Sequence, residues 1–178
     1  MIRTREKVFS RAAGLAKKRG MSCPREDEEK TQYLRTIFDT IPLPTFIVDE
    51  DVRIEDFNSA AESFLGPEPV VALHRRGGEA FHCLNAESRG CGKAEPCRDC
   101  ALRNCVKRAI DGRATHQELI TVELRNQQGS NPIDLQITAN LLPYSESPRV
   151  LVILENVTEL TSLRRIVSGL GPTRTGTA

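Results

Sequence analysis

Apolar side chains recur at spacings of three and four residues near the start of the chain and again near its end. The first run begins at Thr31 and is ended by Pro42 and Pro44, which predicts an amphipathic helix. The second run follows Thr158, a residue suited to cap a helix, and contains Leu160, Leu163, Val167 and Leu170. Its three-four-three spacing is that of a short coiled-coil seam, and a helix folded back on its own sheet is the alternative.

Between these runs the apolar positions mostly alternate, as they do in half-buried strands. Residues 45–49 and 52–57 predict a hairpin around Glu50 and Asp51. Residues 120–125 and 133–141 predict two longer strands around a turn at 126–131. Residues 149–154 are almost continuously apolar, which favours a strand in the middle of a sheet.

Two further helices are expected between the first hairpin and the long strands. Asn58 and Ser59 can cap a helix over 60–65, which Gly66 and Pro67 end. The apolar positions after Cys100 predict a helix that ends at Gly112. Residues 67–100 are the least regular part of the chain, and a loop of this length in a compact domain needs something to hold it in place.

Composition limits the classes of function that fit. The chain has 178 residues, a net charge of +1 and 28% charged residues, which suits one ordinary domain and indicates neither nucleic acid nor membrane as a partner. Residues 1–30 form an arm that is basic first and acidic later, and 172–178 form a polar tail. No apolar stretch of signal-peptide or transmembrane type follows the basic part, so we expect a cytoplasmic protein with reduced thiols.

Five of the six cysteines lie in one loop, 82–105. Cys83, Cys91, Cys97 and Cys100 are the candidate ligands of a metal centre, and the last two form a C-x-x-C pair. Gly90 and Gly92 allow the backbone around Cys91 to adopt positive φ. Cys100 is expected at a helix N-terminus, and Cys105 on the apolar face of that helix as a non-ligand.

Four thiolates select zinc or an iron-sulfur cluster, and the irregular spacing favours the cluster, with zinc as the alternative. Reduced thiols without metal and a redox disulfide are the other interpretations of the same residues. His82 is a candidate to replace one thiolate, although a histidine beside a ligand is more often a neighbour than a ligand.

The order of elements resembles that of a PAS sensory domain over residues 31–160. The resemblance lies in Ile37–Asp49, in the strand and Asn-Ser-Ala-Ala-Glu segment of 54–62, and in the Val152–Glu159 ending, where Asn156 replaces the family's usual Asp. It implies an α+β fold: a five-stranded antiparallel sheet with helices on one face, an N-terminal helix and a C-terminal helix. The loop is similar to a cysteine-rich variant of bacterial sensor proteins.

The resemblance implies a sensory or protein-interaction role. We expect redox or oxygen sensing through the four-cysteine centre, with output through the exit helix at 158–171. That output needs a kinase or regulator as partner, or a homodimer formed through residues 160–170. The alternatives are an interaction module with structural zinc, and a pocket for a small molecule or haem with His74, His82 or His116 as axial ligand. Catalytic motifs for phosphate loops, nucleophile elbows and zinc proteases are missing from the sequence, so no enzyme is expected.

Overall fold

A five-stranded antiparallel sheet forms the centre of the protein. The computed structural model describes residues 24–66, 68–126, 129–143 and 147–169. Within them the strand order is β2-β1-β5-β4-β3, so β5 occupies the middle of the sheet and β2 and β3 its edges. This confirms the predicted fold class, including the central position of the most apolar strand.

The five strands follow the predicted pattern with small shifts at their ends. They are β1 (Thr45–Val48), β2 (Ile54–Phe57), β3 (Thr115–Asn126), β4 (Gly129–Leu142) and β5 (Arg149–Asn156). β3 and β4 pair from Thr115 to Gly129, and so the turn between them is tighter than the 126–131 turn expected. In β5 the buried and half-buried positions alternate, with Val150, Val152 and Leu154 on the buried face.

The longer helices are α2 (Pro24–Thr40), α3 (Ser59–Leu65), α5 (Ala101–Ile110) and α6 (Thr158–Gly169). α3 has Asn58 as its cap, as predicted, and the Asn58 side chain accepts a hydrogen bond from the Ala61 amide. α2 begins at Pro24, seven residues before the predicted start at Thr31. Glu26 and Asp27 lie in its first turn, where acidic side chains favour a helix without any apolar stripe. Residues 1–23, including Cys23, and the tail at 172–178 lie outside the described residues.

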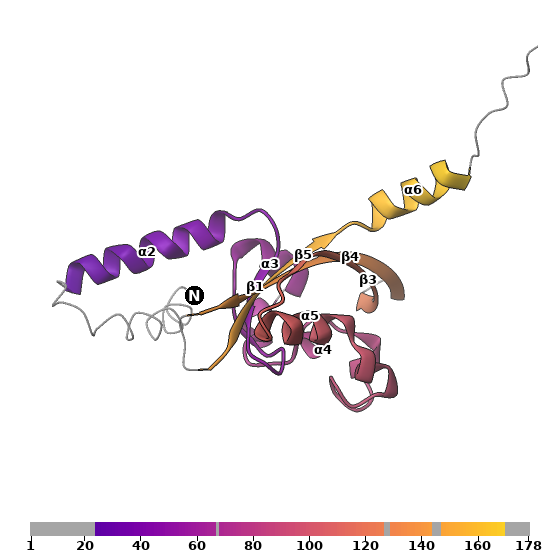
Figure 1. Ribbon diagram of the computed structural model, residues 1–178, viewed down its shortest axis with the longest axis horizontal. Coiled ribbons are helices and arrows are strands. Elements are labelled where there is room, and N and C mark those ends of the chain that lie inside the picture. Colours follow the sequence, from indigo (N-terminus) through magenta and orange to yellow (C-terminus); the bar gives the residue numbers. More distant parts are fainter. Residues whose placement is uncertain (1–23, 67, 127–128, 144–146, 170–178) are drawn as a thin grey trace, which may run out of the picture.

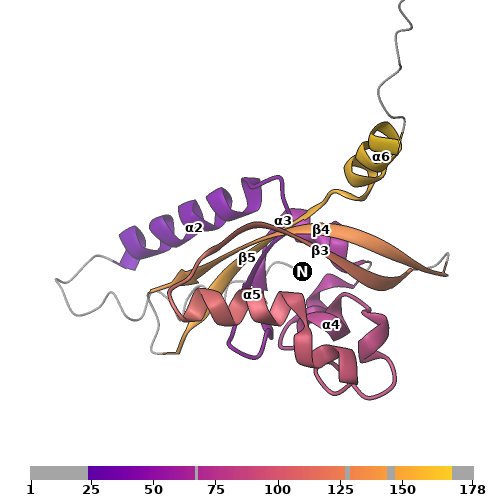
Figure 2. The same ribbon diagram turned by 45° about the vertical axis from the view of Figure 1, so that its right-hand side comes forward.

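The helices lie in separate places around the sheet. In Figures 1 and 2, α4 (Gly77–Ala80) and α5 lie on one side of the strands and α2 on the other, while α6 leaves the end of β5 and points away from the body. Three 3₁₀ turns complete the irregular region: η2 (Pro69–Ala72), η3 (Leu84–Ala86) and η4 (Glu95–Asp99). No helix in the described part of the chain is long and apolar enough to cross a membrane.

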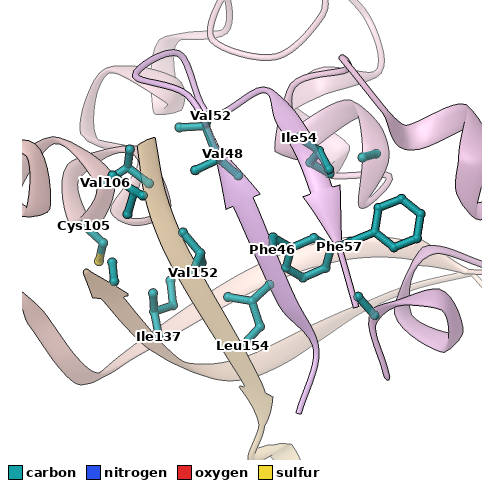
Figure 3. Close-up of a cluster of buried hydrophobic side chains, with 14 of the residues drawn as sticks. Phe46, Val48, Val52, Ile54, Phe57, Cys105, Val106, Ile137, Val152 and Leu154 are labelled. Atoms are coloured by element: carbon teal, nitrogen blue, oxygen red, sulfur yellow. The ribbon is translucent and has the colours of Figure 1, made fainter. Parts of the chain in front are cut away.

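The hydrophobic core lies between the sheet and α5. Figure 3 shows Cys105 and Val106 of α5 beside Ile137 and Val152 of the sheet, and all four are at most 2% exposed. Phe46 of β1 is 1% exposed and its ring lies edge-on to those of Phe64 and Phe81, with centroids 6.4 and 5.1 Å away. Aromatic rings therefore fill the end of the core that faces α3 and α4.

α2 is attached to the sheet by a polar network. The Arg35 guanidinium donates to both carboxylate oxygens of Asp56, to Asp39 and to the Phe57 carbonyl, at 2.7–3.0 Å. Asp56 is 2% exposed, so its charge is compensated inside the protein rather than by water. Burial tends to raise the pKa of Asp39, but the hydrogen bonds and charge of Arg35 hold it below 3.8.

The irregular region between α3 and α5 is bonded to both edges of the curved sheet. On one side the His74 amide donates to the Ile54 carbonyl (2.7 Å) and the Gly77 amide to the Val52 carbonyl (2.8 Å), beside β2. On the other side Cys83 forms a bridge with Leu124 of β3. The cysteine loop is thereby attached to an edge of the sheet.

Candidate metal centre

The four candidate ligands come from four turns of the irregular region. Cys83 precedes η3, Cys91 lies between Gly90 and Gly92, Cys97 is inside η4, and Cys100 is the residue before α5, as predicted. Cys97 is buried and the other three are half-buried. Cys105, the predicted non-ligand, is fully buried in the core and packs there as a small apolar side chain.

Cys83 and Cys91 each interact electrostatically with Cys97 and Cys100. Burial raises the pKa of the Cys83 thiol, and negative charge on Cys100 and Cys97 raises it further. The pKa of Cys91 is raised by burial and by the same two residues, while the nearby Arg103 lowers it. Each of the first two thiols thus interacts with both members of the C-x-x-C pair, although they are up to seventeen positions apart.

Cys91 is held by the segment Arg76–Glu79, which includes the start of α4. The Glu79 carboxylate accepts from the Cys91 amide (3.2 Å), and Arg76 Nη1 donates to the Cys91 carbonyl (3.1 Å). The Gly78 amide donates to the Cys91 sulfur, and a Cβ on Gly78 would stand 2.8 Å from that sulfur. Residues 76–79 therefore bind the amide, the carbonyl and the sulfur of Cys91, and a side chain at position 78 would require the Cys91 sulfur to move.

Backbone amides also point at the sulfur of Cys83. The Asn85 amide partly offsets the effect of burial on the pKa of Cys83, and the Ala86 amide donates to the Cys83 carbonyl (2.8 Å). Gly90 and Gly92 have φ of +86° and +87°, the left-handed conformation predicted from the glycines that flank Cys91. Amides directed at sulfur favour the anionic thiolate, which is the form that binds metal.

The four cysteines are not arranged as a metal site in this structure. Among the described residues, no group of three or more His, Cys, Asp or Glu side chains is arranged so that it could hold a metal ion. Four thiols have no mutual attraction, and thiolates repel each other unless a cation lies between them, so a metal-free arrangement is expected to be more open. Four thiols suit a thiolate-bound metal in chemistry, but the loop would have to move before they could bind one ion together.

The three histidines are all exposed, at positions 74, 82 and 116. His82 adopts φ of +56° beside Cys83, and it lines a hollow together with Leu65, Val71 and Arg75. The volume of this hollow, about 240 Å³, falls below the roughly 300–1,000 Å³ of most ligand pockets. The rings of Phe46, Phe64 and Phe81 pack edge to face against one another, and none of them lines this hollow.

Sequence reasoning did not identify the residues that position Cys91. Arg76, Gly78 and Glu79 lie twelve or more positions before Cys91. The adjacent Gly77-Gly78 pair was the available signal, since paired glycines mark close backbone approach as well as turns. Arg103 was also missed: its guanidinium lies where a Cβ on Gly92 would be, beside Arg76.

Part of the sequence matches the model of a known domain family, and several solved structures have a similar fold. The PAS domain family model matches residues 32–100, which cover β1, β2, α3 and the four candidate ligands. No curated protein matches the sequence. A PAS domain from a two-component sensor histidine kinase superposes with a TM-score of 0.50 at 8% identity, covering 72% of this chain and 97% of that one.

Other solved structures have a similar fold at 16–18% sequence identity. The PAS domain of Bordetella pertussis BvgS has 18% identity and a TM-score of 0.47 over 80% of this chain and 96% of its own. The PAS domain of an HTR-like protein from Haloarcula marismortui has 16% identity and a TM-score of 0.47 over 72% and 98%. The family match covers residues 32–100 of this chain, and the structure has the fold seen in solved PAS domains.

Proposed function

We propose that this PAS domain senses redox state or oxygen through a metal centre held by Cys83, Cys91, Cys97 and Cys100. The single observation that supports the proposal is that Cys83 and Cys91, from separate turns, are both affected electrostatically by Cys97 and Cys100. A thiolate-bound metal supplies the attraction that the thiols lack by themselves.

The surroundings of the four sulfurs support an anionic centre. Arg76 and Arg103 bring two guanidinium groups to the turn at Gly92, next to Cys91. Four thiolates around a divalent metal or a cluster carry net negative charge, and adjacent cations compensate it. An iron-sulfur cluster is the first choice because its charge and integrity depend on oxidation, and structural zinc is the alternative.

Loss of the metal is expected to change the loop more than the sheet. Ala86 and Cys97 are the buried residues of the loop 82–100, all of which the structure describes. Burial of apolar side chains therefore contributes little to the stability of this loop. A domain whose ligand loop loosens when metal leaves has a local switch with a structural readout.

The output is proposed to pass through α6. Leu160, Leu163, Ile166 and Val167 are 46–70% exposed, so this helix offers an apolar face for a second copy or for a kinase or regulator. Reduced thiols at the centre fit a reducing compartment such as the cytoplasm. No enzymatic activity is proposed for the domain itself.

The test is purification of the full chain without oxygen, followed by measurement of iron, zinc and acid-labile sulfide. We expect bound metal that is lost when any one of Cys83, Cys91, Cys97 or Cys100 is replaced by serine. Cys105→Ser is the matched control. Cys105 is buried on α5, the helix that follows Cys100, and the protein should keep its metal when Cys105 is replaced. Iron with sulfide, and absorption that bleaches in air, supports the cluster.

Stoichiometric zinc without sulfide would replace redox sensing by the structural-zinc alternative. Protein without metal, or four variants that retain it as the wild type does, would reject the metal centre altogether.

A further inference from the structure

The cysteine loop is bonded directly to the edge strand β3. The Arg125 amide donates to the His82 carbonyl (2.9 Å), next to the bridge between Cys83 and Leu124. The Arg125 side chain forms an ion pair with Glu87, in which Nη2 and Oε2 are 2.8 Å apart. The first candidate ligand is thus joined to β3 through main-chain and side-chain contacts.

The same strand contacts a buried carboxylate on β4. Thr121 lies four positions before Arg125 and is the register partner of Asp134. The Thr121 hydroxyl donates to Asp134 Oδ1 (2.7 Å), and Asp134 is only 3% exposed. An acidic residue buried in a sheet is uncommon unless its charge is bonded by specific partners.

The other partners of Asp134 are on the exit helix. The Thr161 hydroxyl and Arg165 Nη2 both donate to Oδ2, the latter at 3.0 Å. The Asp134 amide donates to Thr158 Oγ1 (3.0 Å), and the Val157 amide donates to the Asp134 carbonyl (2.9 Å). This one residue binds the first two turns of α6 through its main chain and its carboxylate.

Hydrogen bonds and an ion pair, rather than apolar packing, therefore hold α6 in position. Its apolar residues Leu160, Leu163 and Ile166 are mainly exposed, so burial contributes little to its direction. The hydrogen bonds from Thr161 and Thr121 and the charge of Arg165 hold the pKa of Asp134 below 3.8, and the carboxylate is ionised at neutral pH.

We propose that Asp134 is a positioning residue that couples the cysteine loop to α6 through β3. Loosening of the contacts at His82 and Cys83 frees the β3 end of the loop, shifts Thr121 and changes how firmly the carboxylate holds Thr161 and Arg165. The coupling rests on the proposed function in one respect: metal binding by the four cysteines would determine whether the loop is ordered or loosened. It requires two arrangements of α6, held and released, whose balance the loop alters.

Hydrogen exchange of the full chain, resolved by peptide, tests the output side. Asp134→Asn keeps the shape of the side chain and removes its charge. We expect the amides of 158–165 to exchange about tenfold faster, since hydrogen bonds to a charged group are stronger than those to a neutral one. Protection of β1 and β5 and the content of bound metal should not change. Asp111→Asn, an exposed acid at the end of α5, is the matched control.

The input side is tested without any metal by Glu87→Gln, which removes the ion pair to Arg125. This change should speed exchange in 158–165 when Asp134 is present and have little further effect in the Asp134→Asn background, a non-additive double-mutant cycle. Thr161→Val removes one of the same hydrogen bonds from the side of the helix and leaves Asp134 in the sheet unchanged. It should also speed exchange in 158–165, and it serves as the test if Asp134→Asn perturbs the sheet.

The outcomes separate the two proposals. Non-additivity in a protein that binds no metal would keep the coupling and reject the metal centre. Bound metal with unchanged α6 exchange in Asp134→Asn and Thr161→Val, or fully additive effects of Glu87→Gln, would overturn the coupling alone.

Discussion

The sheet and the cysteine loop are stabilised in different ways. In the sheet, Phe46, Ile54, Ile137 and Leu154 are at most 1% exposed and the strands pair in continuous register except at two bulges. In the loop 82–100 the backbone forms short 3₁₀ turns, and polar contacts fix it: Arg76 donates to the Cys91 carbonyl, Glu79 accepts from the Cys91 amide, and Glu87 pairs with Arg125 of β3.

This difference indicates which part of the domain depends on a bound group. Burial of apolar surface stabilises the sheet whether or not metal is present. The loop lacks a comparable core, so its order depends on polar contacts and on whatever joins the sulfurs. If the proposed metal centre exists, the domain could lose its metal and keep its fold.

The largest effect is expected in the core. Phe46→Ala removes a fully buried ring that contacts Phe64 and Phe81, and should lower the free energy of unfolding by about 3–5 kcal/mol. Urea unfolding in the presence and absence of a chelator measures it, and the loss should be equal in both. A loss that appears only with metal would contradict the division between sheet and loop.

The polar attachment of α2 comes next and adds pH dependence to the sheet side. Arg35→Met removes the partner of Asp39 and of the buried Asp56, and should cost about 2 kcal/mol at pH 7, reduced by the partial exposure of Arg35.

The pKa of Asp39 is lowered in the folded protein, so the stabilisation is present above 3.8 and declines as the pH falls below it. Unfolding curves at pH 7 and at about pH 3 should show a smaller penalty for Arg35→Met in acid. A penalty that grew on acidification would show that the pair does not stabilise the folded state in this way.

Gly78→Ala is expected to affect the loop rather than the sheet. The new Cβ would stand 2.8 Å from the Cys91 sulfur, which must then move away from the other thiols. Metal affinity should fall at least about tenfold, with a change in unfolding free energy of only about 1 kcal/mol. Ser88→Ala, an exposed position in the same loop, is the control. Equal metal affinity in Gly78→Ala and wild type would contradict the observed packing.

The smallest effect is expected at His82. Asparagine tolerates positive φ, so His82→Asn should keep the backbone at +56° and change metal affinity by less than about twofold. A large loss, measured by competition with a chelator, would show that the histidine replaces one of the thiolates.

The fold could be predicted because the strands differ from the helices in their apolar pattern. Apolar and polar residues alternate in most strands, and residues 149–154 are almost continuously apolar. The shifts occur where pattern is weak: Glu26 and Asp27 start α2 early through their charge, a contribution that apolar periodicity does not register. The turns η3 and η4 are too short for any periodicity. Sequence patterns specify long elements better than short ones.

The candidate site could be predicted only in part. Cysteine spacing gave Cys83, Cys91, Cys97 and Cys100 as candidate ligands, which stays a prediction, and it placed Cys105 on the buried face of α5, as the structure does. It could not identify Arg76 or Glu79, whose role depends on the path of the chain back to Cys91. Asp134 occupies an outward position in an alternating strand, where an acid is expected to face water, and its burial under α6 is a tertiary effect.

Titration of the reduced, metal-free protein with Co²⁺ under anaerobic conditions tests the central claim most directly. If Cys83, Cys91, Cys97 and Cys100 can close on one ion, a single equivalent will give the absorption of tetrahedral cobalt bound to four thiolates, and serine at any of the four will weaken it. Absence of this absorption in the wild type, or full intensity in all four serine variants, would contradict the account.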